Sequence, residues 1–166
     1  DWKRFVSDQT ISFMKNEMEP LRKITPNVPV TTNMMGFYPV VDYPKMAKEL
    51  DLVSWDSYPN FDGMPLSTES WKKVAMIHDA YRAMKPGKPF LLIESTPSTS
   101  NWYPYMRAKK PGVHRFEGLQ AIAHGSDGAM YFQWRQSKGS TEMYHGAVVT
   151  HAGAEGVRVF EEVAQL

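Results

Sequence analysis

The sequence contains no cysteine. This excludes a disulfide framework, a thiol nucleophile and a metal site built on thiolates, but it does not fix the compartment, because secreted proteins can also lack disulfides. No run approaches the roughly 18 consecutive apolar residues that cross a bilayer, so we expect a soluble chain with no membrane partner. Lys and Arg number 19 against 18 Asp and Glu, so the chain has no basic field that would hold nucleic acid.

Several catalytic signatures are missing as well. There is no GxSxG elbow, no Walker loop and no GxGxxG, so serine hydrolase, nucleotide and dinucleotide sites lack their parts. The 5 histidines show neither HxxxH nor HExxH spacing, and no carboxylate cluster accompanies a pair of them. We therefore predict neither a metal nor a cofactor.

Apolar and aromatic residues are plentiful in the 166-residue chain, at 42% and 13%, with 5 Trp and 8 Tyr. This content fits a folded domain with a core rather than a disordered chain. An aromatic excess also fits platforms that stack against sugar rings. The sequence opens at Asp1 inside an amphipathic pattern with no Met start, so we expect residues 1–166 to be a piece of a longer protein.

Helix-like and strand-like stretches alternate along the chain. Four short apolar runs, each typical of a strand buried on both faces, are separated by stretches with helical spacing. This alternation predicts βα units and a parallel sheet, hence an α/β fold. The expected strands are 28–32, 52–55, 90–93 and 129–132, and the expected helices are 2–22, 44–50, 71–84, 113–123 and 155–165.

Each expected strand is followed by a polar or charged side chain. These are Asn33, Asp56, Glu94 and the run Gln133-Trp134-Arg135. In parallel α/β folds the carboxyl ends of the strands form the active face, so the pattern predicts a site of the kind found in a (β/α) barrel. Any one of these residues reads equally well as a solvated strand exit, but four in sequence favour a site. The long, aromatic stretch 95–112 is expected to contribute to it.

Glu94 is the first catalytic candidate, because it follows four apolar residues directly. A carboxylate in that place is held firmly and stays ionised. In retaining glycoside hydrolysis such a residue acts as the nucleophile, with a second carboxyl about 5–5.5 Å away as acid/base. On this pattern alone Glu94 could equally be a metal ligand or a salt-bridge partner, and Asp56 could equally hydrogen-bond the loop that follows it.

Four motifs carry a resemblance to a known family. They are Thr31-Thr32-Asn33-Met34-Met35-Gly36, Ser54-Trp55-Asp56-Ser57-Tyr58-Pro59, Glu94-Ser95-Thr96-Pro97 with Asn101-Trp102, and Tyr131-Phe132-Gln133-Trp134-Arg135-Gln136 with His145-Gly146-Ala147-Val148-Val149. In their order and spacing, across essentially the whole chain, they resemble glycoside hydrolase family 42, the β-galactosidases. The resemblance implies a (β/α)8 TIM barrel. Residues 1–166 would be the C-terminal half of this catalytic domain, roughly its last four βα units.

The resemblance also implies roles for single residues. Glu94 matches the catalytic nucleophile, Trp102 matches a tryptophan that contacts the sugar, and Glu142 with His145 matches a pair that hydrogen-bonds galactose hydroxyls. The pocket would also be lined by Asn33, Asp56, Tyr58 and Arg135. The acid/base Glu of the family has no counterpart in this sequence, so the chain alone is expected to be inactive. The four-Cys zinc cluster of some members is also absent.

The expected function is retaining hydrolysis of terminal β-D-galactosides through a galactosyl-enzyme intermediate. The resemblance implies a β-galactoside oligosaccharide as substrate and a homo-oligomer, commonly a trimer, for the intact protein. Two alternatives stay open, namely α-L-arabinopyranosidase specificity on the same scaffold and a non-catalytic carbohydrate-binding half-barrel. An Asn-Glu pair ending an upstream strand would favour the enzyme, and its absence would favour the binding module.

Overall fold

The computed structural model describes residues 1–59, 68–102 and 107–166. Within these ranges four strands form one parallel sheet in the order β1-β2-β3-β4. The strands are β1 (Asn33–Met34), β2 (Val53–Asp56), β3 (Phe90–Glu94) and β4 (Ser126–Ala129), and the helices are α1 (Trp2–Ile24), α2 (Tyr43–Ala47), α3 (Thr68–Met84), α4 (Val113–Ala123) and α5 (Arg158–Ala164). The predicted alternation of helices and parallel strands is confirmed.

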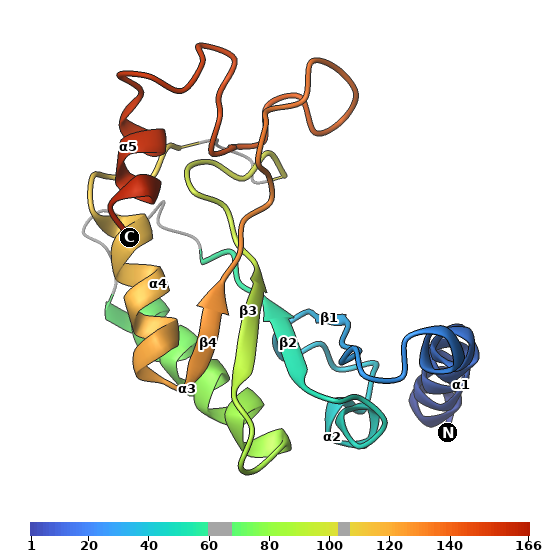
Figure 1. Cartoon of the computed structure of the whole chain (residues 1–166). Coiled ribbons are helices and arrows are strands. Elements are labelled where there is room, and N and C mark those ends of the chain that lie inside the picture. Colours follow the sequence, from blue (N-terminus) through green and yellow to red (C-terminus); the bar gives the residue numbers. More distant parts are fainter. Residues whose placement is uncertain (60–67, 103–106) are drawn as a thin grey trace.

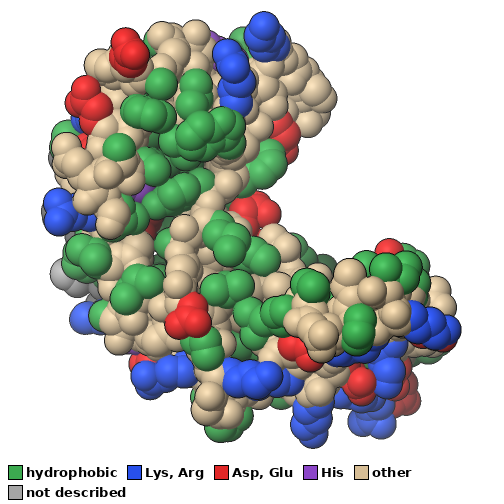
Figure 2. Space-filling model, viewed as in Figure 1, with side chains coloured by type: hydrophobic (Ala, Val, Ile, Leu, Met, Phe, Trp, Pro, Cys, Tyr) green, Lys and Arg blue, Asp and Glu red, His purple; other side chains and the backbone are tan. Residues whose placement is uncertain are grey.

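The helices line one side of the sheet and both of its ends (Figure 1). Helix α3 packs against β2 and α4 packs against β4. Helix α1 lies near β1 and α5 lies beside α4, so the two termini are at opposite ends of the sheet (Figure 1). The segments after β3 and β4 extend beyond the carboxyl ends of the strands, and the hollow between them and α1 is bordered by hydrophobic side chains (Figure 2). None of the described helices is long and apolar enough to cross a bilayer.

The first expected strand, 28–32, is wrong, because pairing begins only at Asn33. The residues before it bond to the turn that precedes β2 instead. Val30 N donates to Asp51 Oδ2 at 2.7 Å, and Thr31 Oγ1 donates to the Leu52 carbonyl at 2.9 Å. The β-branched run therefore approaches the sheet without joining its ladder.

The fourth strand lies three residues earlier than the expected 129–132. The observed strand, Ser126–Ala129, is Ser-Asp-Gly-Ala, which carries too little hydropathy to be found from the sequence. Beyond it, Met130 N and Phe132 N still donate to the carbonyls of Leu92 and Ser95, both at 2.8 Å. The apolar run is thus an irregular continuation of β4 toward the carboxyl edge of the sheet.

The sequence predicts strands that are buried on both faces. This prediction is correct for β2 and wrong for β3. In β2 the first three residues, ending at Trp55, are all buried, whereas in β3 burial alternates. Phe90 and Leu92 are buried in the core, while Leu91 and Ile93 are only partly buried. The reason is that Phe90 lies on the face of β3 that meets α3, where His78 stacks on it, whereas Leu91 and Ile93 belong to the other face.

The core holds β2 against α3 through aromatic side chains. Trp55 stacks on Tyr81 with 5.4 Å between ring centroids, and its Nε1 donates to His78 Nδ1 at 3.1 Å. Burial lowers the pKa of His78 to about 4, so the ring is neutral and its Nδ1 can accept. The Tyr81 hydroxyl donates to the Gly36 carbonyl at 2.8 Å. The core therefore positions both β2 and the turn after β1.

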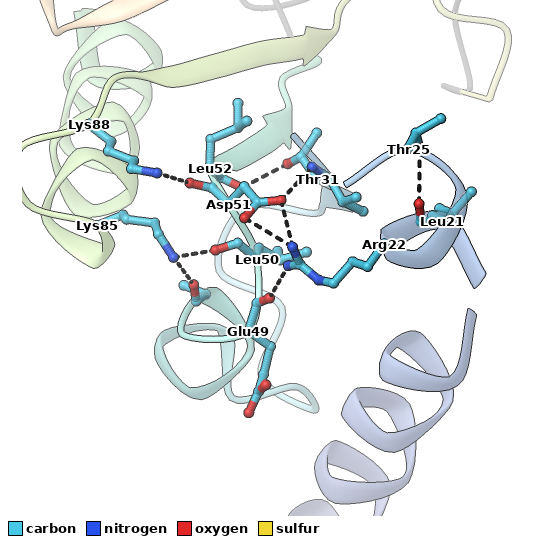
Figure 3. Close-up of polar contacts among 12 residues, drawn as sticks. Leu21, Arg22, Thr25, Thr31, Glu49, Leu50, Asp51, Leu52, Lys85 and Lys88 are labelled. Carbon is cyan, nitrogen blue, oxygen red and sulfur yellow. Dashed lines mark hydrogen bonds and ion pairs between the residues drawn. The ribbon is translucent and has the colours of Figure 1, made fainter. Parts of the chain in front are cut away.

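A polar network at the amino ends of the strands ties α1 to the sheet (Figure 3). Asp51, in the turn before β2, accepts from Val30 N at 2.7 Å and from Arg22 Nη1 of α1 at 3.3 Å. Lys88 Nζ donates to the Asp51 carbonyl at 3.0 Å. One aspartate thus joins α1, the approach to β1 and the turn before β3.

Replacing Asp51 by Ala should lower the free energy of unfolding at pH 7 by about 1–2 kcal/mol, because the Val30 amide and Arg22 lose their acceptor. The hydrogen bond from Val30, assisted by Arg22 and opposed by burial, holds the pKa of Asp51 below its ordinary 3.8. A carboxylate whose folded-state pKa is lowered contributes stability above about 3.8 and loses it as the pH falls through the folded value. Urea unfolding should therefore show a deficit for Asp51→Ala that shrinks from pH 7 to pH 3. Asp127→Ala, at an exposed position of β4, is the control, and an equal loss there would contradict the prediction.

Candidate functional site

The carboxyl ends of β1, β2 and β3 bring polar side chains into contact. Asn33 Nδ2 donates to Asp56 Oδ1 at 2.8 Å and to Glu94 Oε2 at 3.0 Å. Tyr58, two residues after β2, donates its hydroxyl to Glu94 Oε1 at 2.6 Å. Both carboxylate oxygens of Glu94 are thus held by donors. We call Asn33, Asp56, Tyr58 and Glu94 the carboxylate cluster.

A bulge in the pairing of β2 with β3 sets this geometry. Trp55 pairs with Leu92, but the next residue of β2, Asp56, pairs with Glu94, so Ile93 is skipped. Asp56 and Glu94 therefore end their strands as direct neighbours across the sheet.

Burial and the closeness of two carboxyls set the charges in the carboxylate cluster. Burial raises the pKa of Asp56 to about 7, the charge of Glu94 adds to the rise, and the hydrogen bond from Asn33 opposes it. Burial and the bond to Glu94 raise the pKa of Tyr58 far above its usual range, so its hydroxyl stays protonated and donates. Below about pH 7 a largely protonated Asp56 therefore stands beside Glu94.

Aromatic rings stand next to the carboxylate cluster. The rings of Tyr58 and Trp102 meet edge to face with 4.5 Å between centroids, and Trp102 lies 5.1 Å from the ring of His145. Phe132 packs edge to face on His145 at 4.9 Å. We call Tyr58, Trp102, Phe132 and His145 the aromatic wall. Trp102 is 51% exposed, so an apolar surface lies close to Glu94.

His145 is fully buried and its Nδ1 faces two oxygens. Asn101 Oδ1 lies at 3.2 Å and Glu142 Oε2 at 3.7 Å. The hydrogen bond to Asn101 Oδ1, with the Glu142 carboxylate nearby, assigns the ring proton to Nδ1. Burial lowers the pKa of His145 against the pull of the Glu142 carboxylate, so the ring is neutral at pH 7. Asn101 Nδ2 in turn donates to the Thr141 carbonyl, which ties the segment after β4 to the segment after β3.

Gly146 allows these two segments to approach closely. Its backbone N donates to the Thr99 carbonyl at 2.8 Å. A Cβ at Gly146 would lie 2.6 Å from Thr99 N and 2.9 Å from Thr96 Oγ1, closer than side chains pack. The buried Lys109 donates from Nζ to the Thr96 carbonyl and to the Glu117 carboxylate, which anchors the same segment after β3.

Contacts within the carboxylate cluster and the aromatic wall, together with the approach of Glu142 to His145, join seven of the eight residues predicted for the site. They are Asn33, Asp56, Tyr58, Glu94, Trp102, Glu142 and His145. Arg135 stands apart, since it is exposed and its backbone bridges to Val149; its place in the pocket stays a prediction. Sequence reasoning misses Asn101 and Phe132 as partners of His145, although one directly precedes Trp102 and the other ends the fourth apolar run.

The surroundings of Glu94 bear on the two other roles that its place in the sequence leaves open, those of a metal ligand and of a salt-bridge partner. Among residues 1–59, 68–102 and 107–166, no three His, Asp or Glu side chains gather as they do around a metal ion. The groups that hydrogen-bond the Glu94 carboxylate in those ranges are an amide and a phenol rather than a cation. A carboxylate held by neutral donors keeps its negative charge available for attack on an electrophile.

Comparison with known proteins identifies the family. The model of the family Glyco_hydro_42, described as Beta-galactosidase, matches residues 1–166. The beta-galactosidase GalA of Bacillus licheniformis is 51% identical over 173 aligned residues, which cover 100% of this chain and 26% of that protein. Gan42B, a GH42 beta-galactosidase from G. stearothermophilus, has a TM-score of 0.93 and 51% identity over 99% of this chain and 25% of its own. The cold-adapted beta-galactosidase from Rahnella sp. R3 has a TM-score of 0.96 and 48% identity over 99% of this chain and 24% of its own.

The chain spans about a quarter of the length of the relatives and solved structures that it matches. Those structures are barrel enzymes, so the parallel sheet and its helices are part of a (β/α)8 barrel, and the fold class expected from the sequence is confirmed. Because the family model matches from the first residue to the last, the chain belongs to glycoside hydrolase family 42, the beta-galactosidases.

Proposed function

We propose that residues 1–166 supply the C-terminal half of the catalytic barrel of a retaining β-galactosidase, with Glu94 as its nucleophile. The observation that carries the proposal is the double hold on Glu94, by Asn33 on Oε2 and by Tyr58 on Oε1, beside the exposed indole of Trp102. The relatives named as beta-galactosidases support it.

In the first step the Glu94 carboxylate attacks the anomeric carbon of a β-galactoside. A galactosyl ester forms and the bond to the leaving oxygen breaks, while an acid from outside this chain protonates that oxygen. In the second step water attacks the same carbon, gives its proton to that outside group and releases Glu94 as a carboxylate. Asn33 and Tyr58 hold the nucleophile in position without pairing it with a full positive charge.

Recognition of the sugar is shared by three side chains, those of Trp102, Glu142 and His145. Trp102 offers its apolar face to the C–H side of the galactose ring. The Glu142 side chain is 43% exposed and lies next to the fully buried His145, so Glu142 offers a carboxylate oxygen to a hydroxyl at the mouth of the site and His145 would bind a hydroxyl deeper in it. An epimer with a misplaced hydroxyl leaves Glu142 unpaired, which is how such a site discriminates between sugars.

In the complete enzyme, a 2-deoxy-2-fluoro-β-galactoside with a good leaving group should label Glu94. Fluorine slows both steps by destabilising the oxocarbenium-like transition state, while the leaving group restores only the first, so the glycosyl ester accumulates. Mass spectrometry after digestion should find one added fluorosugar on the peptide that contains Glu94. A label on Asp56 or Glu142 would show that the role is assigned to the wrong residue.

Removal of the nucleophile tests the same assignment in a second way, independently of the labelling. Glu94→Ala should abolish hydrolysis, and azide should restore turnover of an activated galactoside by entering the vacated face. The product should then be the α-galactosyl azide. A β-azide product would contradict nucleophilic attack by Glu94.

Glu142→Ala should weaken binding without removing the chemistry. Loss of a charge-assisted hydrogen bond to a hydroxyl should raise KM about 10- to 100-fold, and azide should give no rescue because the nucleophile is still present. Steady-state kinetics with nitrophenyl β-galactoside and α-L-arabinopyranoside measure this change and the sugar preference. An unchanged KM would remove Glu142 from the binding site.

Residues 1–166 alone should turn over no nitrophenyl galactoside. They carry the proposed nucleophile without the matching acid, and β1 and β4 are the two edges of their sheet, which invites association between copies. The measurement is hydrolysis by the purified chain beside the complete enzyme. Turnover near the rate of the complete enzyme would mean that the acid lies within this chain.

A further inference from the structure

Asp56 takes no step in the chemistry above, yet it is built into the carboxylate cluster. It ends β2 as Glu94 ends β3, and the two pair across the bulge. Both carboxyls share one donor, Asn33 Nδ2, at 2.8 Å and 3.0 Å. The Asn33 amide is therefore held between two carboxyl groups, of which the reaction consumes only one.

The shared donor decides which end of the Asn33 amide faces Glu94. An amide has a donating nitrogen and an accepting oxygen, and only the nitrogen can bond a carboxylate. During retaining hydrolysis Glu94 changes from an anion to a neutral ester and back, so its own hold on Asn33 weakens between the two steps. Asp56 is not consumed, and whether ionised or protonated it still offers an oxygen that accepts from Asn33 Nδ2, so its bond keeps the amide in place throughout.

We propose that Asp56 is a positioning residue for the nucleophile, which keeps the Asn33 donor on Glu94 and, when it ionises, adds a second negative charge beside it. This inference rests on the proposed function, because it assigns Asp56 a part in the reaction of Glu94.

The surroundings of Asp56 place its ionisation near neutral pH. Burial raises its pKa to about 7, with a further rise from Glu94 and an opposing effect of the Asn33 hydrogen bond. Among the residues that the structure describes, the other titratable groups that face it are three phenols, Tyr58 after β2, Tyr43 on α2 and Tyr81 on α3. Their pKa values are raised, so they stay neutral while Asp56 titrates. None of the described groups that shift the pKa of Asp56 is a cation.

An ionised Asp56 should make Glu94 a stronger nucleophile. The second negative charge raises the free energy of the Glu94 carboxylate and stabilises the positive charge that develops on the sugar ring. The reaction of Glu94 should therefore quicken as the pH rises through about 7, provided that the leaving group needs no acid.

The test is the rate constant for inactivation of the complete enzyme by 2-deoxy-2-fluoro-β-galactosyl fluoride, measured from pH 5 to pH 9. Fluoride leaves with little need for the acid, so the profile reports on the nucleophile and its neighbours. For the wild type we expect a rise of about 3- to 10-fold centred near pH 7, and for Asp56→Asn a profile without that rise. Asp79→Asn, on the exposed side of α3 where Asp79 pairs with Arg82 and His124, should keep the wild-type profile.

A second comparison separates the effect of Asp56 on the position of Asn33 from the effect of its charge. Asparagine keeps an acceptor oxygen for Asn33 and alanine does not, so at pH 6 kcat should fall about 10- to 100-fold in Asp56→Ala and far less in Asp56→Asn, with KM nearly unchanged in both. Thermal unfolding checks that both variants are folded. Equal losses in the two variants, or the wild-type pH profile in Asp56→Asn, would overturn the inference while labelling of Glu94 upholds the proposed function. A wild-type enzyme that is not labelled at Glu94 would overturn the proposed function itself.

Discussion

The pairing of β2 with β3, with its bulge after Trp55, is the constraint on which the candidate site depends. In a regular register Asp56 would pair with Ile93, and Glu94 would pair with Ser57. Side chains alternate between the two faces of a strand, so Asp56 and Glu94 would then belong to opposite faces. The skipped residue brings both carboxyls to one place, where a single Asn33 amide can reach them.

The core holds this pairing in place, because β2 contributes residues to both the core and the site. Trp55 is the last buried residue of β2, and its indole is held by Tyr81 and His78 from α3. Asp56 follows Trp55 immediately. The packing that stabilises the fold therefore also fixes the position of Asp56 in the carboxylate cluster. The Tyr81 hydroxyl reaches the Gly36 carbonyl after β1, which extends the same hold to the strand that carries Asn33. Stability and site geometry therefore come from one set of contacts.

How much the sequence predicts depends on whether the signal is local. An apolar run followed by a polar residue is a local signal, and it finds the strand ends at Asp56 and Glu94. Strand β4 has no such signal, because Ser126–Ala129 becomes a strand through its pairing with β3, including a bond from Leu92 N to Ser126 Oγ at 3.1 Å. The bulge and the wall around His145 arise from segments far apart in the chain. No spacing within either segment records them, and the family resemblance supplies residue roles but not these contacts.

Tyr58 belongs to both the carboxylate cluster and the aromatic wall, and it holds the two at a fixed position relative to each other. Its hydroxyl donates to Glu94 at 2.6 Å, while its ring packs against Trp102 with 4.5 Å between centroids. Burial keeps the phenol protonated, so the hydroxyl end stays a donor, and the planar ring has few rotatable bonds that could let the two ends drift apart. Under the proposed function, a sugar that lies against Trp102 would thereby be set at a fixed distance from Glu94, the proposed nucleophile. One rigid side chain after β2 therefore couples the Glu94 carboxylate on β3 to the exposed indole of Trp102 in the segment that follows.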